Sequence, residues 1–161
     1  MGTEIRYNKD SMPKIDPKLC IGCRACSNAC PSNAIVIKDD LIQGTRSIVL
    51  DLSHCIGCRA CGEVCIKDAI EFIEEIELVS LSMGNLTEEV TLKLAKCPIC
   101  GNFSEFTEKQ IEEAKKALTD LPGEFIEEIM KYLPLCRKCR RRYLLMNASE
   151  LSLLKFMLKA F

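Results

Sequence analysis

The sequence predicts an α+β protein that consists of a duplicated half and a second half with a small metal-binding module and helices, and two observations lead to this fold class. A segment recurs after a shift of 35 residues, so that "KIDPKLCIGCRACSNACPSNAIVI" aligns with "VLDLSHCIGCRACGEVCIKDAIEF". Each copy has the pattern of a short strand, a cysteine loop, one helical turn and a second strand. The second observation is the change of pattern after residue 78, where helical periodicity separates two further cysteine pairs.

The elements of the duplicated half follow from its local pattern. Apolar runs predict strands at residues 34–38 and 69–75. Between the two copies, Asp39, Asp40 and Gly44 provide the turn residues of a hairpin. We therefore expect the two copies to be joined by a hairpin-like return of the chain.

The second half begins with alternating residues and continues with helices. The alternation over residues 77–96 predicts a two-stranded excursion that leads into "CPICG". Thr107 and Gln110 have the spacing of a capping box, which predicts a helix over residues 108–118. Two further helices are expected, at residues 124–133 and 149–161.

Composition and charge limit the class of protein. The chain of 161 residues has a net charge of −1, so it lacks the basic excess typical of nucleic-acid binding. No window reaches the roughly 18 to 20 consecutive apolar residues of a membrane span. Its N-terminus has no apolar signal segment, so we expect a reduced, cytoplasmic chain in which the twelve cysteines bind metal and form no disulfides.

The first eight cysteines form two C-x2-C-x2-C-x3-C runs, the spacing of ferredoxins that hold two [4Fe-4S] clusters. In such a run three cysteines surround one cluster, and the fourth reaches the neighbouring cluster after the chain has turned away. The ligands predicted for cluster 1 are Cys20, Cys23, Cys26 and Cys65. Those predicted for cluster 2 are Cys55, Cys58, Cys61 and Cys30. This half is therefore predicted to be a bacterial-type two-cluster ferredoxin fold with a pseudo-twofold repeat.

Several residues of the two runs are not ligands but bear on the clusters. The last cysteine of the first run is followed by Pro31 and that of the second by Ile66, a difference expected to alter cluster solvation. Arg24 and Arg59 lie inside the loops, where they either stabilise the reduced clusters or remain solvated surface residues. His54 is expected to pack or to form a hydrogen bond, because each cluster already has four sulfur ligands.

The last four cysteines form a separate predicted site of two C-x2-C pairs, Cys97 with Cys100 and Cys136 with Cys139. Four thiolates in this pattern favour a closed, structural zinc site in a small zinc-ribbon-like module with helices. A single rubredoxin-like iron is the alternative, because "CPxCG" is typical of both. The basic run at residues 137–142 is interpreted as a solvated face that also contacts another protein.

These features divide the chain into four predicted segments. An N-terminal arm covers residues 1–13, and the two-cluster domain covers residues 14–78. The four-cysteine module with its helical insertion covers residues 79–146. The last segment, residues 147–161, has apolar stripes that predict a helix docked on a partner subunit.

The order of a two-cluster unit and two C-x2-C pairs resembles the small iron–sulfur subunit of formate hydrogenlyase and related membrane-bound [NiFe] hydrogenase complexes. The segments "CIGCRACSNACPSNAI" and "HCIGCRACGEVC" are similar to the two motifs of that subunit, and the two-cluster subunit of respiratory complex I is related. The resemblance implies an electron relay between a donor module and the hydrogenase small subunit. It also implies a place at the inner face of the cell membrane, reached through partner subunits.

The leading hypothesis is therefore an electron-transfer subunit that is not an enzyme alone, because no nucleophile, general base or substrate pocket is recognisable in the sequence. A formate dehydrogenase or ferredoxin-type module is the expected donor, and a membrane-bound [NiFe] hydrogenase-type complex the expected acceptor. Two alternatives remain open at this point. One is a free ferredoxin with a stabilising zinc domain, and the other is a regulatory or nucleic-acid-binding protein that uses its zinc knuckles.

Overall fold

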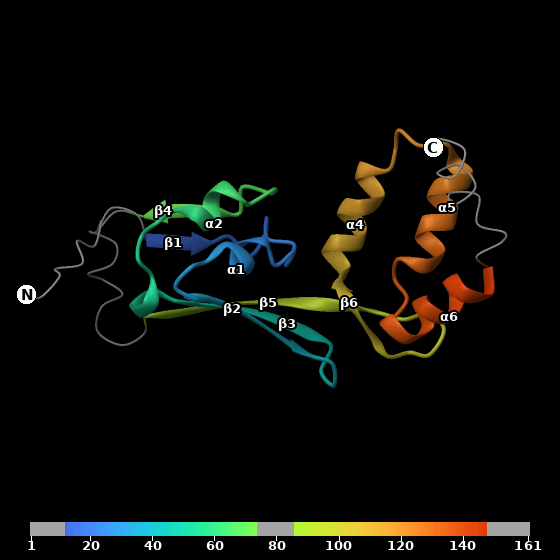
Figure 1. Ribbon diagram of the computed structural model, residues 1–161, viewed down its shortest axis with the longest axis horizontal. Coiled ribbons are helices and arrows are strands. Elements are labelled where there is room, and N and C mark those ends of the chain that lie inside the picture. The colour runs from blue at the N-terminus through green and yellow to red at the C-terminus, as the bar shows by residue number, and fades with distance from the viewer. Residues whose placement is uncertain (1–11, 74–85, 148–161) are drawn as a thin grey trace, which may run out of the picture. The chain divides into compact units, whose positions relative to one another are not determined.

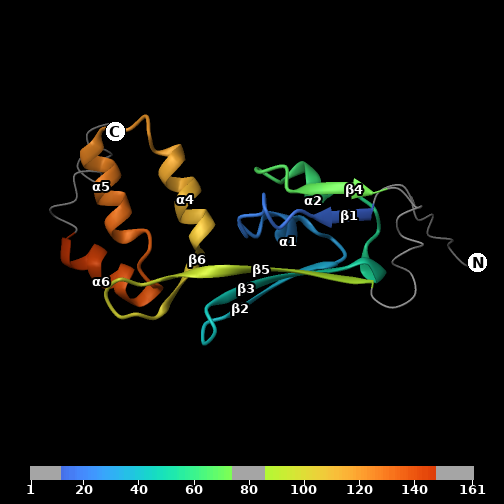
Figure 2. The ribbon, with the colours of Figure 1, turned by 180° about the vertical axis from the view of Figure 1, so that it is seen from behind.

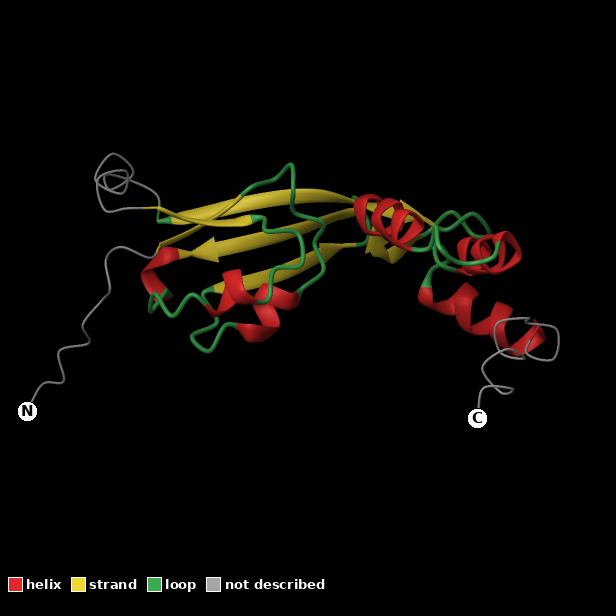
Figure 3. Ribbon diagram, turned by 90° about the horizontal axis from the view of Figure 1, so that it is seen from above, coloured by secondary structure: helices red, strands yellow, loops and turns green. Residues whose placement is uncertain are grey.

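The computed structural model describes residues 12–73 and 86–147, and its elements are labelled in Figure 1. The strands are β1 (Met12–Ile15), β2 (Ile35–Asp40), β3 (Thr45–Asp51), β4 (Ile70–Ile73), β5 (Thr87–Lys96) and β6 (Phe103–Thr107). The α-helices are α1 (Ala25–Ala29), α2 (Ala60–Glu63), α4 (Glu108–Ala117), α5 (Gly123–Tyr132) and α6 (Arg137–Asn147), and Leu52–His54 form a 3₁₀ turn. The chain is thus a mixture of helices and strands, as expected (Figure 3).

The chain divides into two compact units that are not consecutive in sequence. The first contains Met1–Asp39 and Arg46–Thr91, and the second contains Asp40–Thr45 and Leu92–Phe161. The tip of the hairpin between β2 and β3 therefore belongs to the second unit, while the bodies of both strands belong to the first. The predicted segment boundaries stay predictions, and the N-terminal arm and the C-terminal helix fall largely outside the described residues.

The first unit contains a pair of strands that come from the two different copies of the repeat. β1 and β4 are antiparallel, with Met12 opposite Ile73 and Ile15 opposite Ile70, and they lie side by side in Figures 1 and 2. One strand comes from the start of the first copy and the other from the end of the second. This pairing brings the two cysteine loops into one unit, with α1 packed against α2.

The second sheet has the strand order β2-β3-β5-β6. In β3 alternate side chains are buried, because one face of a half-buried strand turns toward the core. The apolar side chains of Ile48 and Leu50 occupy this buried face, and so does Arg46. The expected hairpin between β2 and β3 is confirmed, and its turn ends at Gly44 in the left-handed conformation, with φ of 71°.

Gly44 contacts one residue of β5 and one residue of β6 in the second unit. Its carbonyl accepts a hydrogen bond of 2.8 Å from the backbone N–H of Leu94 in β5. A Cβ at Gly44 would lie 2.2 Å from the ring of Phe103, so only glycine fits both the conformation and the space. β6 continues the sheet beside β5, with Leu94 opposite Thr107 and Lys96 opposite Phe103.

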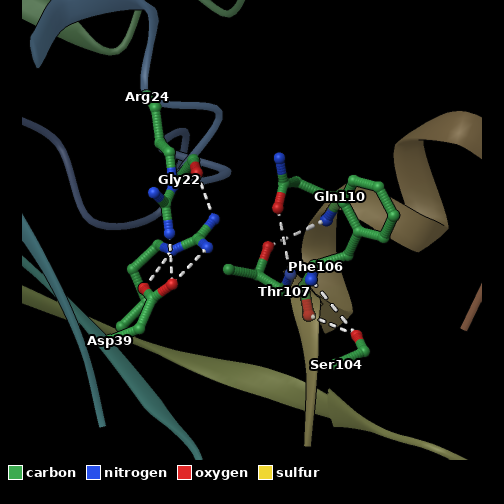
Figure 4. A network of polar contacts seen from close by, with 8 residues as sticks. Gly22, Arg24, Asp39, Ser104, Phe106, Thr107 and Gln110 are labelled. Atoms are coloured by element: carbon green, nitrogen blue, oxygen red, sulfur yellow. Dashed lines mark hydrogen bonds and ion pairs between the residues drawn. The ribbon is translucent and has the colours of Figure 1, made fainter. Parts of the chain in front are cut away.

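The helices of the second unit follow β6. The predicted capping box is confirmed: the Gln110 backbone N–H donates to Thr107 Oγ1 at 3.1 Å, and the Thr107 N–H donates to Gln110 Oε1 at 2.9 Å (Figure 4). α4 and α5 agree with the predictions for residues 108–118 and 124–133 within one residue at each end. Helix α6 was not expected, since its basic sequence was interpreted only as a surface.

Two predictions for this unit lie partly or wholly outside the described residues. Of the predicted excursion over residues 77–96, the structure describes only the second strand, β5. The helix predicted at residues 149–161 is outside the described residues altogether.

Candidate metal centres

The two cysteine loops of the first unit have the same unusual backbone at matching positions. Six residues, three in each loop region and each pair 35 positions apart, adopt positive φ angles. They are Gly22 (73°) and Gly57 (67°), Arg24 (72°) and Arg59 (62°), and Asn33 (55°) and Asp68 (48°). Left-handed conformations cost non-glycine residues roughly 1–2 kcal/mol each. Four of them in the two loops indicate a functional site, because such strain persists only where surrounding contacts hold the backbone in place.

The first cavity brings together cysteines from both loops. Cys20, Cys23 and Cys26 line it from the first loop and Cys65 from the second. Its remaining wall is mostly apolar and includes isoleucines from β1, β2, β3 and β4. This is the set of four cysteines predicted for cluster 1.

The second cavity has the reciprocal composition. Cys55, Cys58 and Cys61 line it from the second loop, and Cys30 lines it from the end of the first. Its wall includes Leu50 of β3, which is fully buried. The structure thus gathers the eight cysteines into the two groups of four that the crossed pattern predicts.

Burial and crowding raise the pKa of two of these thiols, Cys26 and Cys61. Burial, together with the neighbouring sulfurs of Cys20 and Cys23, raises the pKa of Cys26 to about 12. Burial and the sulfur of Cys55 likewise raise the pKa of Cys61 to about 11. Because thiolates are the ligands of iron, such a crowded group ionises readily only when a cationic metal core offsets its negative charge.

The sulfurs of the two crossing cysteines each have a hydrogen-bonding partner close by in the sequence. Burial disfavours the thiolate of Cys30, but the hydroxyl of Ser32 and nearby backbone N–H groups outweigh it and lower the pKa. The sulfur of Cys65 accepts a hydrogen bond of 3.2 Å from the backbone N–H of Ala69. Residues that follow each crossing cysteine in its own loop therefore orient the sulfur toward the cysteines of the other loop.

A buried arginine that the sequence analysis missed supports the first loop. Arg46 of β3 donates from Nε and Nη2 to the two carboxylate oxygens of Asp39, at 2.7 and 2.9 Å. Its Nη1 donates to the carbonyl of Gly22 at 2.8 Å, and Arg24 also pairs with Asp39 (Figure 4). The signal was present in the sequence, because Arg46 occupies an apolar position of the alternating strand "TRSIVLD".

In the second loop, the arginine that matches Arg24 contacts an aromatic ring instead of a carboxylate. The guanidinium carbon of Arg59 lies 5.3 Å from the centre of the Phe72 ring, and Phe72 lines the second cavity. A Cβ at Gly62 would lie only 2.6 Å from Phe72 Cε2. At the matching positions of the first copy the sequence has Ser27 and Ile37. Glycine at one position thus makes room for the larger side chain at the other.

Exchanging this pair one residue at a time is expected to destabilise the first unit. Gly62→Ser should overpack α2 against Phe72 and cost about 1–3 kcal/mol, seen as loss of cluster absorbance at a lower temperature. Adding Phe72→Ile should recover part of this loss, because it restores the combination found in the other copy. Gly123→Ser is the matched control, since no atom lies within 4 Å of a Cβ there. Equal effects of Gly62→Ser with and without Phe72→Ile would contradict this explanation.

The sequence analysis also singled out His54 and Ile66 beside the second cysteine run. His54 Nδ1 lies 2.9 Å from Asp51 Oδ2, so the prediction of a hydrogen-bonding role is confirmed. Ile66 lines the first cavity and is 73% exposed, so an apolar side chain stands between this cavity and solvent.

The last four cysteines form a second kind of site in the second unit. The sulfurs of Cys97, Cys100, Cys136 and Cys139 all lie within 4.8 Å of one another. The first pair is shaped by a tight turn in which the Gly101 N–H donates to the Cys97 carbonyl at 2.9 Å, with φ of 73° at Gly101. The second pair comes from the start of α6. Cys97 and Cys136 are buried with Leu135, and Tyr132 and Tyr143 pack around them.

The close packing of these sulfurs shifts the pKa of Cys97 and of Cys139 in opposite directions. Burial disfavours the thiolate of Cys97, but backbone N–H groups from both cysteine pairs outweigh it and lower the pKa to about 6. The neighbouring sulfur of Cys100 raises the pKa of Cys139 to about 12. Sulfurs so close together cannot all ionise unless a cation lies between them, so the donor set fits a thiolate-bound metal ion.

One member of the basic run holds this site together. Arg140 of α6 pairs with Glu105 of β6 at 2.6 Å, and its guanidinium carbon lies 4.6 Å from the centre of the Phe106 ring. It also donates to the backbone carbonyls of Leu133 and Leu135, at 3.1 and 2.7 Å. Arg140 thus ties the segment before the second cysteine pair to β6, which is a structural role that charge alone did not predict.

Comparison with known proteins agrees with an iron–sulfur character of the first unit. Residues 19–69 match the family model of the 4Fe-4S dicluster domain. Formate hydrogenlyase subunit 6 of Escherichia coli (strain K12) is 37% identical over 148 residues, which cover 92% of this chain and 82% of that protein. Within the described residues, no helix is long and apolar enough to cross a membrane. The resemblance found in the sequence is thereby confirmed, and the chain belongs to the formate hydrogenlyase subunit 6 family of iron–sulfur subunits.

Proposed function

We propose that this chain is an electron-transfer subunit that passes single electrons through two [4Fe-4S] clusters within a formate hydrogenlyase-type complex. The observation that carries the proposal is the crossed composition of the two cavities, each with three cysteines of one loop and one of the other. This is the ligand arrangement of two-cluster ferredoxins, in which two clusters lie close enough to exchange electrons. When bound, the clusters supply the one-electron chemistry.

The residues of the chain have distinct parts in this proposal. Cluster 1 is assigned to Cys20, Cys23, Cys26 and Cys65, and cluster 2 to Cys55, Cys58, Cys61 and Cys30. Buried side chains such as Ile48 and Leu50 form the cavity walls and exclude water from the clusters. The thiolates hold the irons, while burial and hydrogen bonds adjust the reduction potentials.

For the site of the last four cysteines we propose a single zinc ion with a structural role. Zinc–sulfur bonds of about 2.3 Å in a tetrahedron place the sulfurs about 3.8 Å apart. The observed limit of 4.8 Å between the four sulfurs is compatible with this compact arrangement. A four-iron cubane separates its cysteine sulfurs more widely, so the geometry favours one ion, with a single iron as the alternative occupant.

The partners follow from the relative's name and are part of the proposal. That name joins formate to hydrogen, so a formate dehydrogenase or ferredoxin-type donor fits one side of the relay. The small subunit of a membrane-bound [NiFe] hydrogenase fits the other side. The chain then acts as a carrier that is not itself catalytic, held at the inner face of the membrane through its partners.

Anaerobic affinity purification of the full chain from its own host tests this function. We expect about eight irons per chain from the two clusters and one zinc, together with a co-purified [NiFe] hydrogenase subunit. Reduction with dithionite should produce electron paramagnetic resonance (EPR) signals of two clusters. A metal content near four zincs with little iron would overturn the proposal.

A further inference from the structure

Resting on the proposed function, we propose that Arg46 is a positioning residue that raises the reduction potential of cluster 1 through the Gly22 carbonyl and the charge group it forms with Asp39 and Arg24. The hydrogen bonds of its guanidinium reach the carboxylate of Asp39 and the backbone of Gly22. Arg46 thus acts on the cluster through the loop that holds three of the four ligands. Its role is to set how readily cluster 1 accepts an electron.

The burial of Arg46 is the first step of the argument. Only 1% of its surface is exposed, and arginine is almost never fully buried unless it is paired. Its guanidinium is bidentate on Asp39, which is the strong form of this ion pair. A buried ion pair adds little net stability compared with apolar residues of the same size. Stability alone is therefore a weak reason for placing a guanidinium here.

The second step is the charge of the group. Asp39 is shared between two guanidinium groups, those of Arg46 and Arg24. One carboxylate opposite two cations leaves a formal charge of +1. Because Arg46 lies away from solvent, its field is screened much less than that of a surface arginine. In the second loop, by comparison, Arg59 lies over Phe72 and is exposed to solvent.

The third step connects this charge to cluster 1. Gly22 lines the first cavity, and its carbonyl accepts the bond of 2.8 Å from Arg46 Nη1. That carbonyl belongs to the peptide group that also contains the N–H of Cys23, a predicted ligand of cluster 1. A cation on the carbonyl oxygen polarises this peptide and makes its N–H a stronger donor. Reduction adds one negative charge to the cluster. The positive charge of the group and the stronger N–H donor of Cys23 therefore both favour the reduced state.

Two substitutions with opposite charge effects test the proposal. Arg46→Met removes the buried cation and changes the formal charge of the group from +1 to 0. Asp39→Asn removes the carboxylate instead and changes the charge from +1 to +2. In a redox titration followed by EPR on the full-length, cluster-loaded protein, Arg46→Met should lower the potential of cluster 1. Asp39→Asn should raise it, while the potential of cluster 2 stays unchanged in both.

The expected size is about a tenfold change in the ratio of reduced to oxidised cluster 1 at a fixed potential, which is 59 mV for one electron. The signal of cluster 1 is identified as the one that Cys23→Ser removes. Arg46→Lys keeps a positive charge and should recover most of the wild-type potential. If Arg46→Met fails to fold, Asp39→Asn and Arg46→Lys still decide the question, because both keep a cation at the site.

A merely structural role predicts a different pattern. Loss of support for the loop would lower iron content or shift the potential in the same direction in Arg46→Met and Asp39→Asn, which overturns the proposal. An unchanged potential of cluster 1 in both variants overturns it as well. Either result leaves the proposed function intact as long as wild-type protein holds two clusters, and absence of those clusters in wild type would refute the function itself.

Discussion

Cys65→Ser is expected to remove cluster 1 and to leave cluster 2 in place, although Cys65 is part of the second cysteine run. The reason is that Cys65 lines the cavity of Cys20, Cys23 and Cys26. The variant should lose about four irons per chain and one of the two EPR signals. Cys30→Ser should have the reciprocal effect and remove cluster 2.

The comparison that decides this prediction is between pairs of variants. Cys65→Ser should lose the same EPR signal as Cys23→Ser, and Cys30→Ser the same signal as Cys58→Ser. If ligation followed the order of the sequence, Cys65→Ser would instead match Cys58→Ser. All four variants carry the same chemical change, so each serves as the matched control of the others. A match in sequence order would refute the crossed assignment.

Cys136→Ser is expected to empty the site of the last four cysteines and to unfold the packing around it. Cys136 is buried with Cys97 and Leu135, so loss of the ion leaves this small core without its centre. Structural metal ions of this kind contribute on the order of 10 kcal/mol to folding of their modules. Metal analysis should show one ion fewer per chain. Hydrogen exchange should show loss of protection in α5 and α6.

The control for this variant lies in the same turn. Ile99 stands between Cys97 and Cys100 but is 63% exposed, so Ile99→Ser should keep both the metal and the protection. The iron of the two proposed clusters should remain in both variants, because the ligands proposed for it are other cysteines. Full metal content and unchanged exchange in Cys136→Ser would contradict a structural metal site.

The features that the sequence predicted correctly depend on residues close together in the chain. The capping box of α4 joins Thr107 and Gln110, and the hairpin depends on turn residues that end at Gly44. Each is a local interaction whose chemistry is visible within a few residues. The spacing of the cysteines is equally local, which is why the metal-binding character of the chain could be predicted.

The features that the sequence missed depend on residues far apart. Arg46 contacts Gly22, 24 positions earlier, and Arg140 contacts Glu105, 35 positions earlier. An arginine inside an alternating apolar strand indicates burial, but it does not identify the carboxylate and carbonyl that make burial possible. Helix α6 was missed for a related reason, because its basic residues gave no clue that Arg140 faces inward.

The hairpin tip at Asp40–Thr45 has a consequence for cutting the chain into separate pieces. Because this tip belongs to the second unit, the chain passes between the two units at three points: after Asp39, after Thr45 and after Thr91. A cut after Thr91 alone would separate Gly44 from the ring of Phe103 beside it and from the Leu94 N–H that donates to its carbonyl. The two units can therefore not be produced as separate fragments by dividing the chain at a single peptide bond.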